Sequence, residues 1–423
     1  MLEMKSLCFA ILICFVCYQT NAQNKEQLSI EECYKLARQN YPLIQQAELI
    51  QKTAAYSIEN AGKGYLPQFN ISGQASYQSD VTKIPIQIPG INIPILSKDQ
   101  YRLSAEGTQV LFDGGTIKQQ KSEIASNAVV ESQQLEVELY KLKDRINQLF
   151  FGILLINAQL KQNEFLKRDI QLGIDKTKAT IANGAAFKSS LDMLKAELLK
   201  VAQQGTELRY TRKGYIDVLG LFIHQPFTEE VNLVTPVKPV IQSEIRRPEL
   251  GLYDSQRKSM DVKKQGISIR NLPKFNLFLQ GGVGRPALNM LDNSVEPFAI
   301  GGLRMSWLLS GFYTSKREKA IIAINIKEID IQSENFLLNT RFTLKQQDAE
   351  IDKQTNLLTT DDEIIALRTS VKKTSAAQLE YGVINTSDYL REVNAEDQAR
   401  QSKILHEIQL LMAQYNKQTT LGN

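Results

Sequence analysis

The chain has 423 residues and a formal net charge of +4, a balance too mild to indicate a nucleic-acid partner. With 43% hydrophobic and 23% charged residues, it does not have the composition of a disordered chain. The length is enough for one large core or for about two to three ordinary domains.

Residues 1–22 have the pattern of a removable signal peptide. Lys5 precedes the apolar run 7–16, and Ala22 precedes the expected cleavage site. Lipidation of Cys17 is the alternative fate of this segment. Beyond it, no apolar run reaches the roughly 18 residues that a transmembrane helix needs, so we expect no such helix.

The first elements after the leader are a helix and two strands. Ser29 and Glu32 form a capping box, which predicts the start of a helix. A period of two in 66–79 and in 101–112 then predicts two strands, each with one apolar and one polar face. The prolines of the intervening segment 83–94 predict an exposed loop. The polar face of the first strand carries amides and hydroxyls: Gln68, Asn70, Ser72 and Gln74.

A long helical run without proline follows, from 116 to 181. At about 1.5 Å per residue it would be on the order of 100 Å long, which suits a rod that crosses a distance. Asn183 and Gly184 interrupt the pattern, and a second helical run covers 189–223. The first run carries a heptad seam, which predicts packing against a partner helix. The seam consists of Leu135, Leu139, Leu142, Ile146, Leu149, Ile153, Ile156 and Leu160.

The organisation of the first half returns in the second half. The segment 66–70 recurs as 272–276, and the period of two returns in the segment after it, with Arg304 on the polar face. Leu111 lies 73 residues before Gly184, and Leu308 lies 74 residues before Gly382. Two rods of nearly equal length indicate that both reach the same plane.

These patterns predict a mainly α chain with β-strands and an internal two-fold repeat. Four strands are too few to close a barrel, so their edges would be shared with other subunits. The predicted divisions are a signal peptide (1–22), a first repeat (23–223, with a β-hairpin at 66–112 and a helical hairpin at 116–223), a proline-rich linker (224–247), a second repeat (248–418, with a β-hairpin at 272–309 and a helical hairpin at 312–418) and a tail that frays at Thr419 (419–423).

The sequence offers little chemistry. It has two histidines, His224 and His406, which we expect to be structural and solvated, respectively. The acids at 361–363 would point to different sides of a helix, which predicts a solvated surface rather than a cation site. Because no HExxH, GxSxG or Walker motif occurs, we expect no enzymatic activity, no cofactor and no bound metal.

The two predicted rod turns carry small or apolar residues around a glycine. One interpretation is a plain helix reversal in which glycine supplies a positive φ. The other is a docking surface for the helices of a partner. The residues concerned are Asn183, Gly184 and Ala185 in the first turn and Tyr381, Gly382 and Val383 in the second.

Over nearly all of its mature length, the chain resembles the TolC-like outer membrane efflux proteins. Each motif is loose by itself, and the order, spacing and duplication make the match specific. The motifs are Leu28-Ser29-Ile30-Glu31-Glu32, Asn40-Tyr41-Pro42, Leu66-Pro67, Leu111-Phe112-Asp113-Gly114-Gly115, Arg247-Pro248-Glu249-Leu250, Leu272-Pro273 and the run from Gly382 to Asp388.

The resemblance implies a homotrimer in the cell outer membrane. Each subunit would give four transmembrane strands to a twelve-stranded barrel, and long antiparallel helical hairpins would form an α-barrel in the periplasm. The polar residues of the strands, Arg304 included, would line the lumen. A periplasmic adaptor would dock at the turns and connect the channel to an inner-membrane pump of the RND or ABC type.

The resemblance also implies an entrance near the turns that charged residues constrict. Asp388 matches one acidic position of the family, whereas Arg391, Ile384 and Ser190 replace residues of the family's charged entrance, near Ser387. An entrance of this kind should be less cation-selective. The function expected is passive export of small molecules or polypeptides; the alternative is a soluble periplasmic coiled-coil adaptor or scaffold, which would have no barrel.

Overall fold

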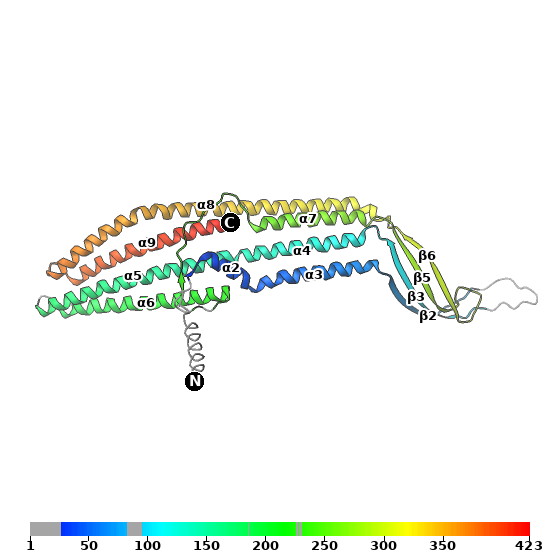
Figure 1. The fold of residues 1–423 in the computed structure, drawn as a ribbon, viewed down its shortest axis with the longest axis horizontal. Helices are drawn as coiled ribbons and strands as arrows, with labels where there is room; N and C mark the ends of the chain where they lie inside the picture. Colours follow the sequence, from blue (N-terminus) through cyan, green and yellow to red (C-terminus); the bar gives the residue numbers. More distant parts are fainter. Residues whose placement is uncertain (1–26, 83–94, 185, 226, 228–230) are drawn as a thin grey trace, which may run out of the picture. The chain divides into compact units, whose positions relative to one another are not determined.

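The computed structural model describes most of the chain after the leader (Figure 1). The predicted signal peptide with Cys17, the predicted loop 83–94 and Ala185 lie outside the described residues. The described residues are 27–82, 95–184, 186–225, 227 and 231–423.

The chain divides into two compact units, and each unit draws segments from both halves of the sequence. The units therefore do not coincide with the two sequence repeats. The first, here called the tip unit, comprises Met1–Ile44, Glu136–Pro248 and Asn335–Asn423; the second, the sheet unit, comprises Gln45–Leu135 and Glu249–Glu334.

Helices dominate the described residues. The helices are α2 (Ile30–Asn40), α3 (Gln45–Gly62), α4 (Thr116–Tyr140), α5 (Leu142–Ala182), α6 (Lys188–Ile223), α7 (Pro248–Ile269), α8 (Gly311–Glu380) and α9 (Thr386–Leu421), with short 3₁₀ turns at Pro42–Ile44 and Lys63–Tyr65. The strands are β1 (Gln27–Leu28), β2 (Gln68–Tyr77), β3 (Asp99–Phe112), β4 (Asn232–Leu233), β5 (Lys274–Arg285) and β6 (Glu296–Ser306).

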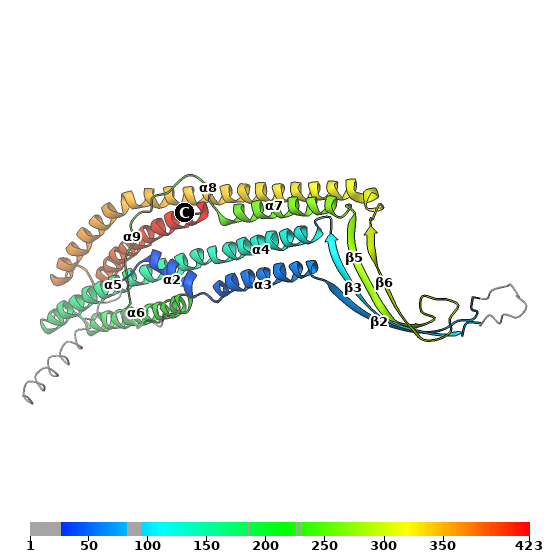
Figure 2. The same ribbon diagram turned by 45° about the vertical axis from the view of Figure 1, so that its right-hand side comes forward.

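The sheet unit holds a four-stranded antiparallel sheet in the order β2-β3-β5-β6, and the strands curve along their length (Figure 2). Ile71 pairs with Ala105, which pairs with Gly281, so the apolar positions of neighbouring strands share one face. Both predicted β-hairpins are confirmed. The ladder between β3 and β5 is irregular only between Val110 and Phe112.

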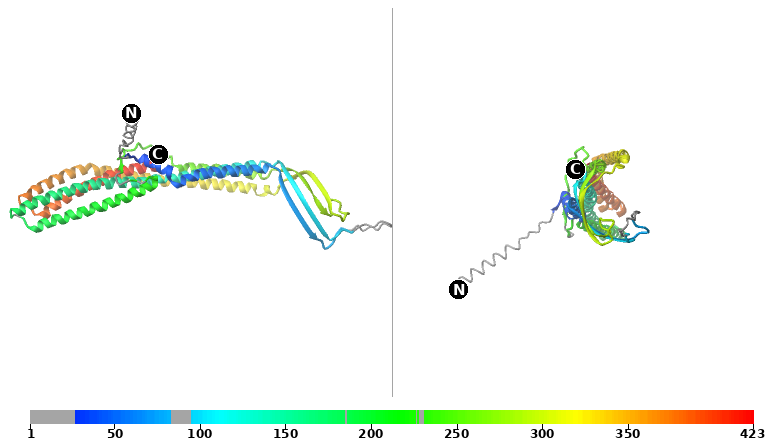
Figure 3. Two further views of the ribbon diagram at one scale, coloured as in Figure 1. Left: turned by 60° about the horizontal axis from the view of Figure 1, so that its bottom comes forward. Right: turned by 90° about the vertical axis from the view of Figure 1, so that its right-hand side faces the viewer.

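The tip unit is built from two helical hairpins, α5–α6 and the C-terminal part of α8 with α9, whose turns lie at the same end (Figure 3). Helix α5 packs against both α6 and α9. The predicted seam is confirmed at its centre, where Ile146 and Ile153 are fully buried. Near the turns the core draws on all four helices: Leu166, Ile170, Ile174, Leu194, Val201, Leu379, Tyr389, Leu390 and Val393.

The predicted helix starts and ends are borne out in part. The Ser29 side chain accepts a hydrogen bond from the Glu32 amide, as the capping box requires. The first long run is not continuous, because Lys141 forms a turn between α4 and α5. The prediction that the last helix frays at Thr419 is wrong: α9 continues to Leu421, and Thr419 is buried, with its carbonyl accepting from the Tyr140 hydroxyl at 2.7 Å.

Within the described part of the chain, no helix combines the length and the apolar character needed to cross a membrane.

Candidate functional site

The first turn, between α5 and α6, is a glycine reversal. Gly184 has a φ of +73°, and its amide donates to the Ile181 carbonyl at 2.9 Å. A Cβ added to Gly184 would have no atom within 4 Å, so only the backbone conformation favours glycine here. Phe187, which precedes α6, is 81% exposed.

The second turn, between α8 and α9, repeats this geometry and adds a helix cap. Gly382 has a φ of +68°, and the Val383 amide donates to the Gln378 carbonyl at 2.8 Å, which closes a Schellman-type end. The Asn385 side chain then accepts from the Asp388 amide at 2.9 Å and starts α9. Tyr381 and Val383 are 82% and 69% exposed, so an apolar tip faces outward.

The two turns come together around a groove of about 250 Å³. Thr177 lies at its base with 2% of its surface exposed, and its hydroxyl has no hydrogen-bond partner among the described residues. The structure thus brings the two predicted docking turns to one place. The lining residues are Thr177, Thr180, Ala186, Phe187, Ser190, Leu379, Gly382, Val383, Ile384, Asn385 and Thr386.

The predicted entrance residues are divided between core and surface. Ser190 lines the groove, and Ile384 packs against the tip-unit core. Ser387 is exposed. Arg391 lies 3.6 Å from the Asp388 carboxylate and 3.1 Å from that of Glu392, so Asp388, the acid that the sequence resemblance singled out, has a basic neighbour on its own helix. The charge of Arg391 is therefore shared between Asp388 and Glu392 within one chain.

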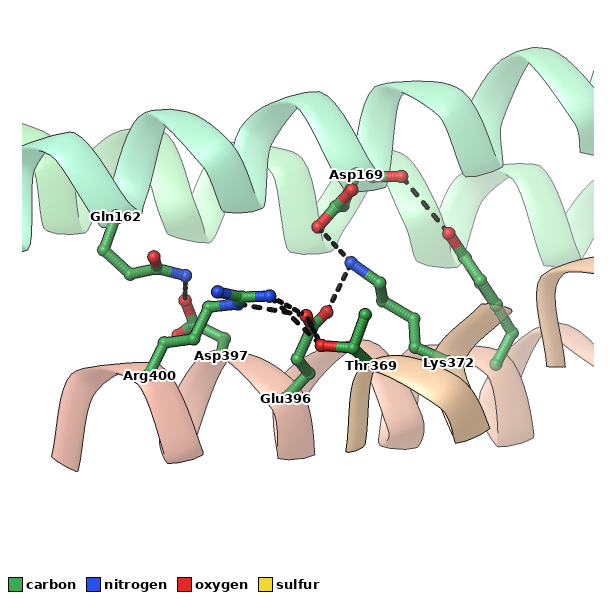
Figure 4. Close-up of polar contacts among 8 residues, drawn as sticks. Gln162, Asp169, Thr369, Lys372, Glu396, Asp397 and Arg400 are labelled. Carbon is green, nitrogen blue, oxygen red and sulfur yellow. Dashed lines mark hydrogen bonds and ion pairs between the residues drawn. The ribbon is translucent and has the colours of Figure 1, made fainter. Parts of the chain in front are cut away.

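Farther from the turns, a polar cluster joins three helices of the tip unit (Figure 4). Lys372 of α8 pairs with Asp169 of α5 at 2.8 Å and with Glu396 of α9. Arg400 also pairs with Glu396, at 2.5 Å. We call Asp169, Thr369, Lys372, Glu396 and Arg400 the ionic layer.

The cluster perturbs the ionisation of its members in different directions. Burial alone would raise the pKa of Glu396, but the hydrogen bonds from Lys372 and other partners outweigh burial and hold that pKa below its usual range. Burial raises the pKa of Asp397, whose carboxylate accepts from Gln162 at 2.9 Å and Gln401 at 3.0 Å. Burial also raises the pKa of Tyr389 to about 12. The sequence pattern did not reveal this cluster, because its members are far apart along the chain.

The prediction that His406 and the acids at 361–363 are solvated is wrong for two of the residues. His406 Nδ1 lies 2.8 Å from Asp361 Oδ2, and the exposed fractions of the two side chains are 18% and 7%. Asp362 remains on the surface, where it pairs with Lys403 at 2.5 Å. The pair of His406 and Asp361 is shielded from solvent because His406 lies on α9, Asp361 lies on α8, and the two side chains face each other between these helices.

The predicted polar face of the sheet is present, with cross-strand contacts. Ser72 and Ser104 hydroxyls lie 3.1 Å apart, and the Gln280 amide donates to Ser104 at 3.2 Å. Arg304 pairs with Glu106 at 3.0 Å across the sheet. The register aligns the other predicted polar positions, Gln68, Asn70 and Gln74, with Thr108, Glu106 and Arg102.

Two aromatic rings on this face were not predicted. Phe278 lies opposite Gly302, and Phe298 lies opposite Gly282. The guanidinium of Arg304 stacks over Phe278 at 4.5 Å, and that of Arg102 stacks over Phe298 at 4.9 Å. In the sequence, each of these two aromatic residues has a glycine at the paired position of the other strand, and this pairing could have indicated that the rings lie on the polar face.

The opposite face is apolar and open to the surroundings. Phe69, Ile71 and Leu279 are 82%, 76% and 65% exposed, and Leu303 is 62% exposed. A shallow groove of about 730 Å³ crosses it over small residues such as Gly301. An exposed apolar surface of this kind marks contact with a membrane or a partner.

Among the described residues, no group of three or more His, Cys, Asp or Glu side chains is placed to hold a metal ion. No family model and no curated protein matches the sequence.

Solved structures do match the fold. CusC, reported with the formation of a transmembrane channel, has a TM-score of 0.68 at 13% identity, and the match covers 93% of this chain and 91% of that chain. VceC of Vibrio cholerae, an outer membrane protein, has a TM-score of 0.66 at 11% identity, covering 93% and 96%. MtrE of Neisseria gonorrhoeae, an outer membrane channel in its open state, has a TM-score of 0.65 at 11% identity, covering 93% and 89%. The fold that the sequence motifs implied, long antiparallel helical hairpins together with a four-stranded β-sheet, is thereby confirmed.

Proposed function

We propose that the protein is the outer membrane channel of a tripartite export system, and that it acts as a homotrimer. The fold likeness to channels such as MtrE supports this proposal. The observation that carries it is the sheet, whose apolar face is exposed while its other face is polar. In a soluble protein the apolar face would be covered by a core.

Three copies would complete the sheet. Within the described residues, β2 and β6 are the outer strands, and each pairs with one neighbour only. An open edge is a template for pairing with another chain. Joining β6 of one subunit to β2 of the next would give a closed barrel of about twelve strands, with the apolar face toward outer membrane lipid and the polar face toward a wet lumen.

The lumen would carry no catalytic group. Gln68, Asn70, Ser72 and Gln74 offer amides and hydroxyls, and Arg304 is neutralised by its pair with Glu106. Such a surface favours hydrated passage of small molecules or polypeptides down a path that is energised elsewhere. The protein therefore acts as a passive conduit rather than as an enzyme.

The helical hairpins would continue the conduit through the periplasm. Each predicted repeat, 23–223 and 248–418, would supply one β-hairpin and one helical hairpin, and the predicted linker 224–247 would connect them. The turns would dock a periplasmic adaptor, which connects the channel to an inner-membrane pump of the RND or ABC type. Exposed Tyr381, Val383 and Phe187 around the groove support an apolar contact there.

The entrance residues would set the selectivity of this end. Arg391 lies beside Asp388 and also pairs with Glu392, so we expect weaker cation selectivity than an entrance with two acidic rings would have. Ser190, Ile384 and Ser387 are uncharged and add no ion pair to hold the entrance closed.

The decisive experiment combines fractionation with tip variants. Wild-type protein should be found in the outer membrane as a trimer, and purified protein should conduct ions in a planar bilayer. Gly382→Asp and Val383→Asp should abolish export while trimers remain in the outer membrane, because each puts a charge into an apolar docking surface. Val240→Asp, at a residue 86% exposed in the linker, is the matched control and should export normally.

Two results would contradict the proposal. Protein released from the periplasm without detergent would favour the soluble scaffold. Export that survives both tip substitutions would remove the docking role of the second turn.

A further inference from the structure

Arg102 of β3 carries a positive charge that has no counter-ion among the described residues. Its side chain is exposed, no carboxylate of the described chain lies within ion-pair distance of it, and its guanidinium donates to no oxygen there. A guanidinium presents all its N–H donors in one plane. A solvated arginine on a surface has these properties too, so the surroundings of Arg102 decide whether it binds a ligand.

Phe298 of β6 holds this guanidinium against the sheet. The Arg102 Cζ atom lies 4.9 Å from the centroid of the ring, and Phe298 is 7% exposed. Strand β5 lies between β3 and β6, and its residues at this level of the polar face are Gly282 and Gly284. Because neither glycine has a side chain, Phe298 and Arg102 meet across β5. The ring covers one side of the guanidinium, and the other side keeps its donors for another partner.

A hollow of about 170 Å³ adjoins Arg102 on the same face. Gln74 and Ser76 of β2 and Gln100 of β3 line it together with the arginine, and Ala287 closes it from the segment after β5. Gln74 lies directly opposite Arg102 in the ladder, and its amide has no hydrogen-bond partner among the described residues. The hollow therefore places amide and hydroxyl donors beside the cation.

The other charges near the hollow are balanced or distant. Arg285 also borders it, and its guanidinium pairs with Asp99 at 3.2 Å. Glu296 shares the cross-strand row of Arg102, but two strand spacings of about 5 Å each separate them. The Glu296 carboxylate accepts from the Ser294 hydroxyl at 2.8 Å. Of the charged side chains that line the hollow, Arg102 is thus the one without a partner in the described part of the chain.

A second arginine on the same face indicates which group such a site takes. Arg304 of β6 lies over Phe278 at 4.5 Å, much as Arg102 lies over Phe298. Its guanidinium binds the Glu106 carboxylate across the sheet at 3.0 Å. The planar fork of a guanidinium matches the two oxygens of a carboxylate. Arg102 has the same aromatic support, and its donors are open to a carboxylate from another molecule.

We propose that Arg102 is a binding site for carboxylate anions on the polar face of the sheet, with Gln74, Ser76 and Gln100 as its polar surroundings. One unpaired cation suits one carboxylate, whereas a doubly charged phosphate would keep an uncompensated negative charge there. That this face lines a lumen rests on the proposed channel function. In such a lumen, three copies of Arg102 would form a basic ring, and basic rings favour anions. The ring would therefore favour cargo that carries a carboxylate.

The test measures benzoate binding to the mature chain in a non-ionic detergent by saturation-transfer NMR, with detergent alone as the blank. Benzoate should bind wild type weakly, because an exposed ion pair contributes little. Benzamide, which has the same shape without the charge, should bind at least about fivefold more weakly. Inorganic phosphate should displace benzoate no better than acetate does, and better displacement by phosphate would contradict the carboxylate assignment.

Two substitutions of Arg102 separate its charge from its shape. Arg102→Gln should weaken benzoate binding by about fivefold or more, since it removes a charged pair of donors. Arg102→Lys keeps the charge but lacks the planar fork, so it should bind benzoate more weakly than wild type and more tightly than Arg102→Gln. Misfolding would not produce this order. Both variants should keep the wild-type urea midpoint, because the side chain is exposed.

Arg304→Gln is the matched control, because it removes the same charge from the same face. The Glu106 carboxylate that it leaves unpaired lies about 13 Å from Arg102 along β3, whereas charges are screened over about 10 Å at roughly 0.1 M salt. Benzoate binding should therefore change by less than about twofold. Equal losses in Arg102→Gln and Arg304→Gln, wild-type binding in Arg102→Gln, or equal binding of benzamide and benzoate would each overturn the site.

The carboxylate site and the channel function can fail separately. If the protein conducts in planar bilayers, benzoate should reduce the wild-type current, and Arg102→Gln should need about fivefold more benzoate for the same reduction. Benzoate binding without any conductance would retain the site and contradict the channel. Conductance together with benzoate binding that Arg102→Gln leaves unchanged would retain the channel and contradict the site.

Discussion

Gly282 of β5 tests how closely the strands of the sheet approach one another. A Cβ at this position would lie 2.2 Å from the Leu103 carbonyl oxygen and 2.8 Å from Ser104 Cα, both on β3. Backbone atoms cannot rotate away as a side chain can, so β3 would have to shift. Overpacking of this kind costs about 1–3 kcal/mol, and we expect Gly282→Ala to lower the free energy of unfolding by that amount.

The preceding residue, Gly281, is the matched control. Its added Cβ would meet only the Phe298 carbonyl oxygen, at 3.8 Å, which is an ordinary contact. Neither glycine has a positive φ, so backbone strain does not separate the two positions. Gly281→Ala should change the free energy of unfolding by less than about 1 kcal/mol, toward greater stability, because alanine restricts the unfolded chain.

The assay uses the single tryptophan of the chain. Trp307 lies just after β6, and its indole N–H donates to the Asn271 carbonyl at 2.9 Å, within the sheet unit. Its fluorescence during urea unfolding in detergent should show a lower midpoint for Gly282→Ala than for wild type. Equal midpoints for the Gly282 and Gly281 variants would refute the reasoning from close approach.

The remaining predictions concern a turn and a thiol. Gly184→Ala should destabilise the protein by about 1 kcal/mol, because alanine is strained at a φ of +73°, whereas Gly214→Ala, inside α6 and equally unobstructed, should stabilise it by about 0.5–1 kcal/mol. Urea unfolding followed by circular dichroism measures both, and a gain at both positions would contradict the turn argument. Burial raises the pKa of the Cys33 thiol to about 12, so at pH 8 this thiol is protonated and shielded. The chain without its predicted leader, which starts at Gln23, should therefore react with a thiol reagent only as fast as it unfolds. Rapid labelling of the folded protein would count against this burial.

Elements with a strong local period were predicted well. The alternation in 66–79 and 101–112 predicted β2 and β3, and the repeat then located β5 and β6. This worked because successive side chains of a strand point to opposite faces, whichever surroundings each face has. Most seam residues of α5 are buried for the same reason, since their spacing assigns them to one side of the helix: Leu142, Ile146, Ile153 and Ile156 are buried, and Leu149 and Leu160 are half-buried. Glycine with helical runs on both sides was enough to locate Gly184 and Gly382.

Contacts between distant residues could not be predicted. Lys372, Asp169 and Glu396 each resemble solvated helix residues by sequence, and only the packing of three helices brings them together. His406 was misjudged in the same way, because Asp361 reaches it from another helix. Thr419 sits in polar sequence, yet it is buried by contacts with residues hundreds of positions earlier in the chain, such as Tyr140.

The buried polar contacts of the tip unit fix the register of its helices, which the apolar seam alone does not. If one helix shifts along its partner by one heptad, the packing energy of an apolar seam changes little, because Leu and Ile recur at every step of the seam. Such a slip of α9 along α5 would move one turn by about 10 Å relative to the other and would separate the two halves of the groove. It would also leave Glu396 buried away from Lys372 and the Asn147 amide away from Asn416, its partner at 2.9 Å. Because unpaired buried groups are costly, these contacts select the one register in which Gly184 and Gly382 reach the same level.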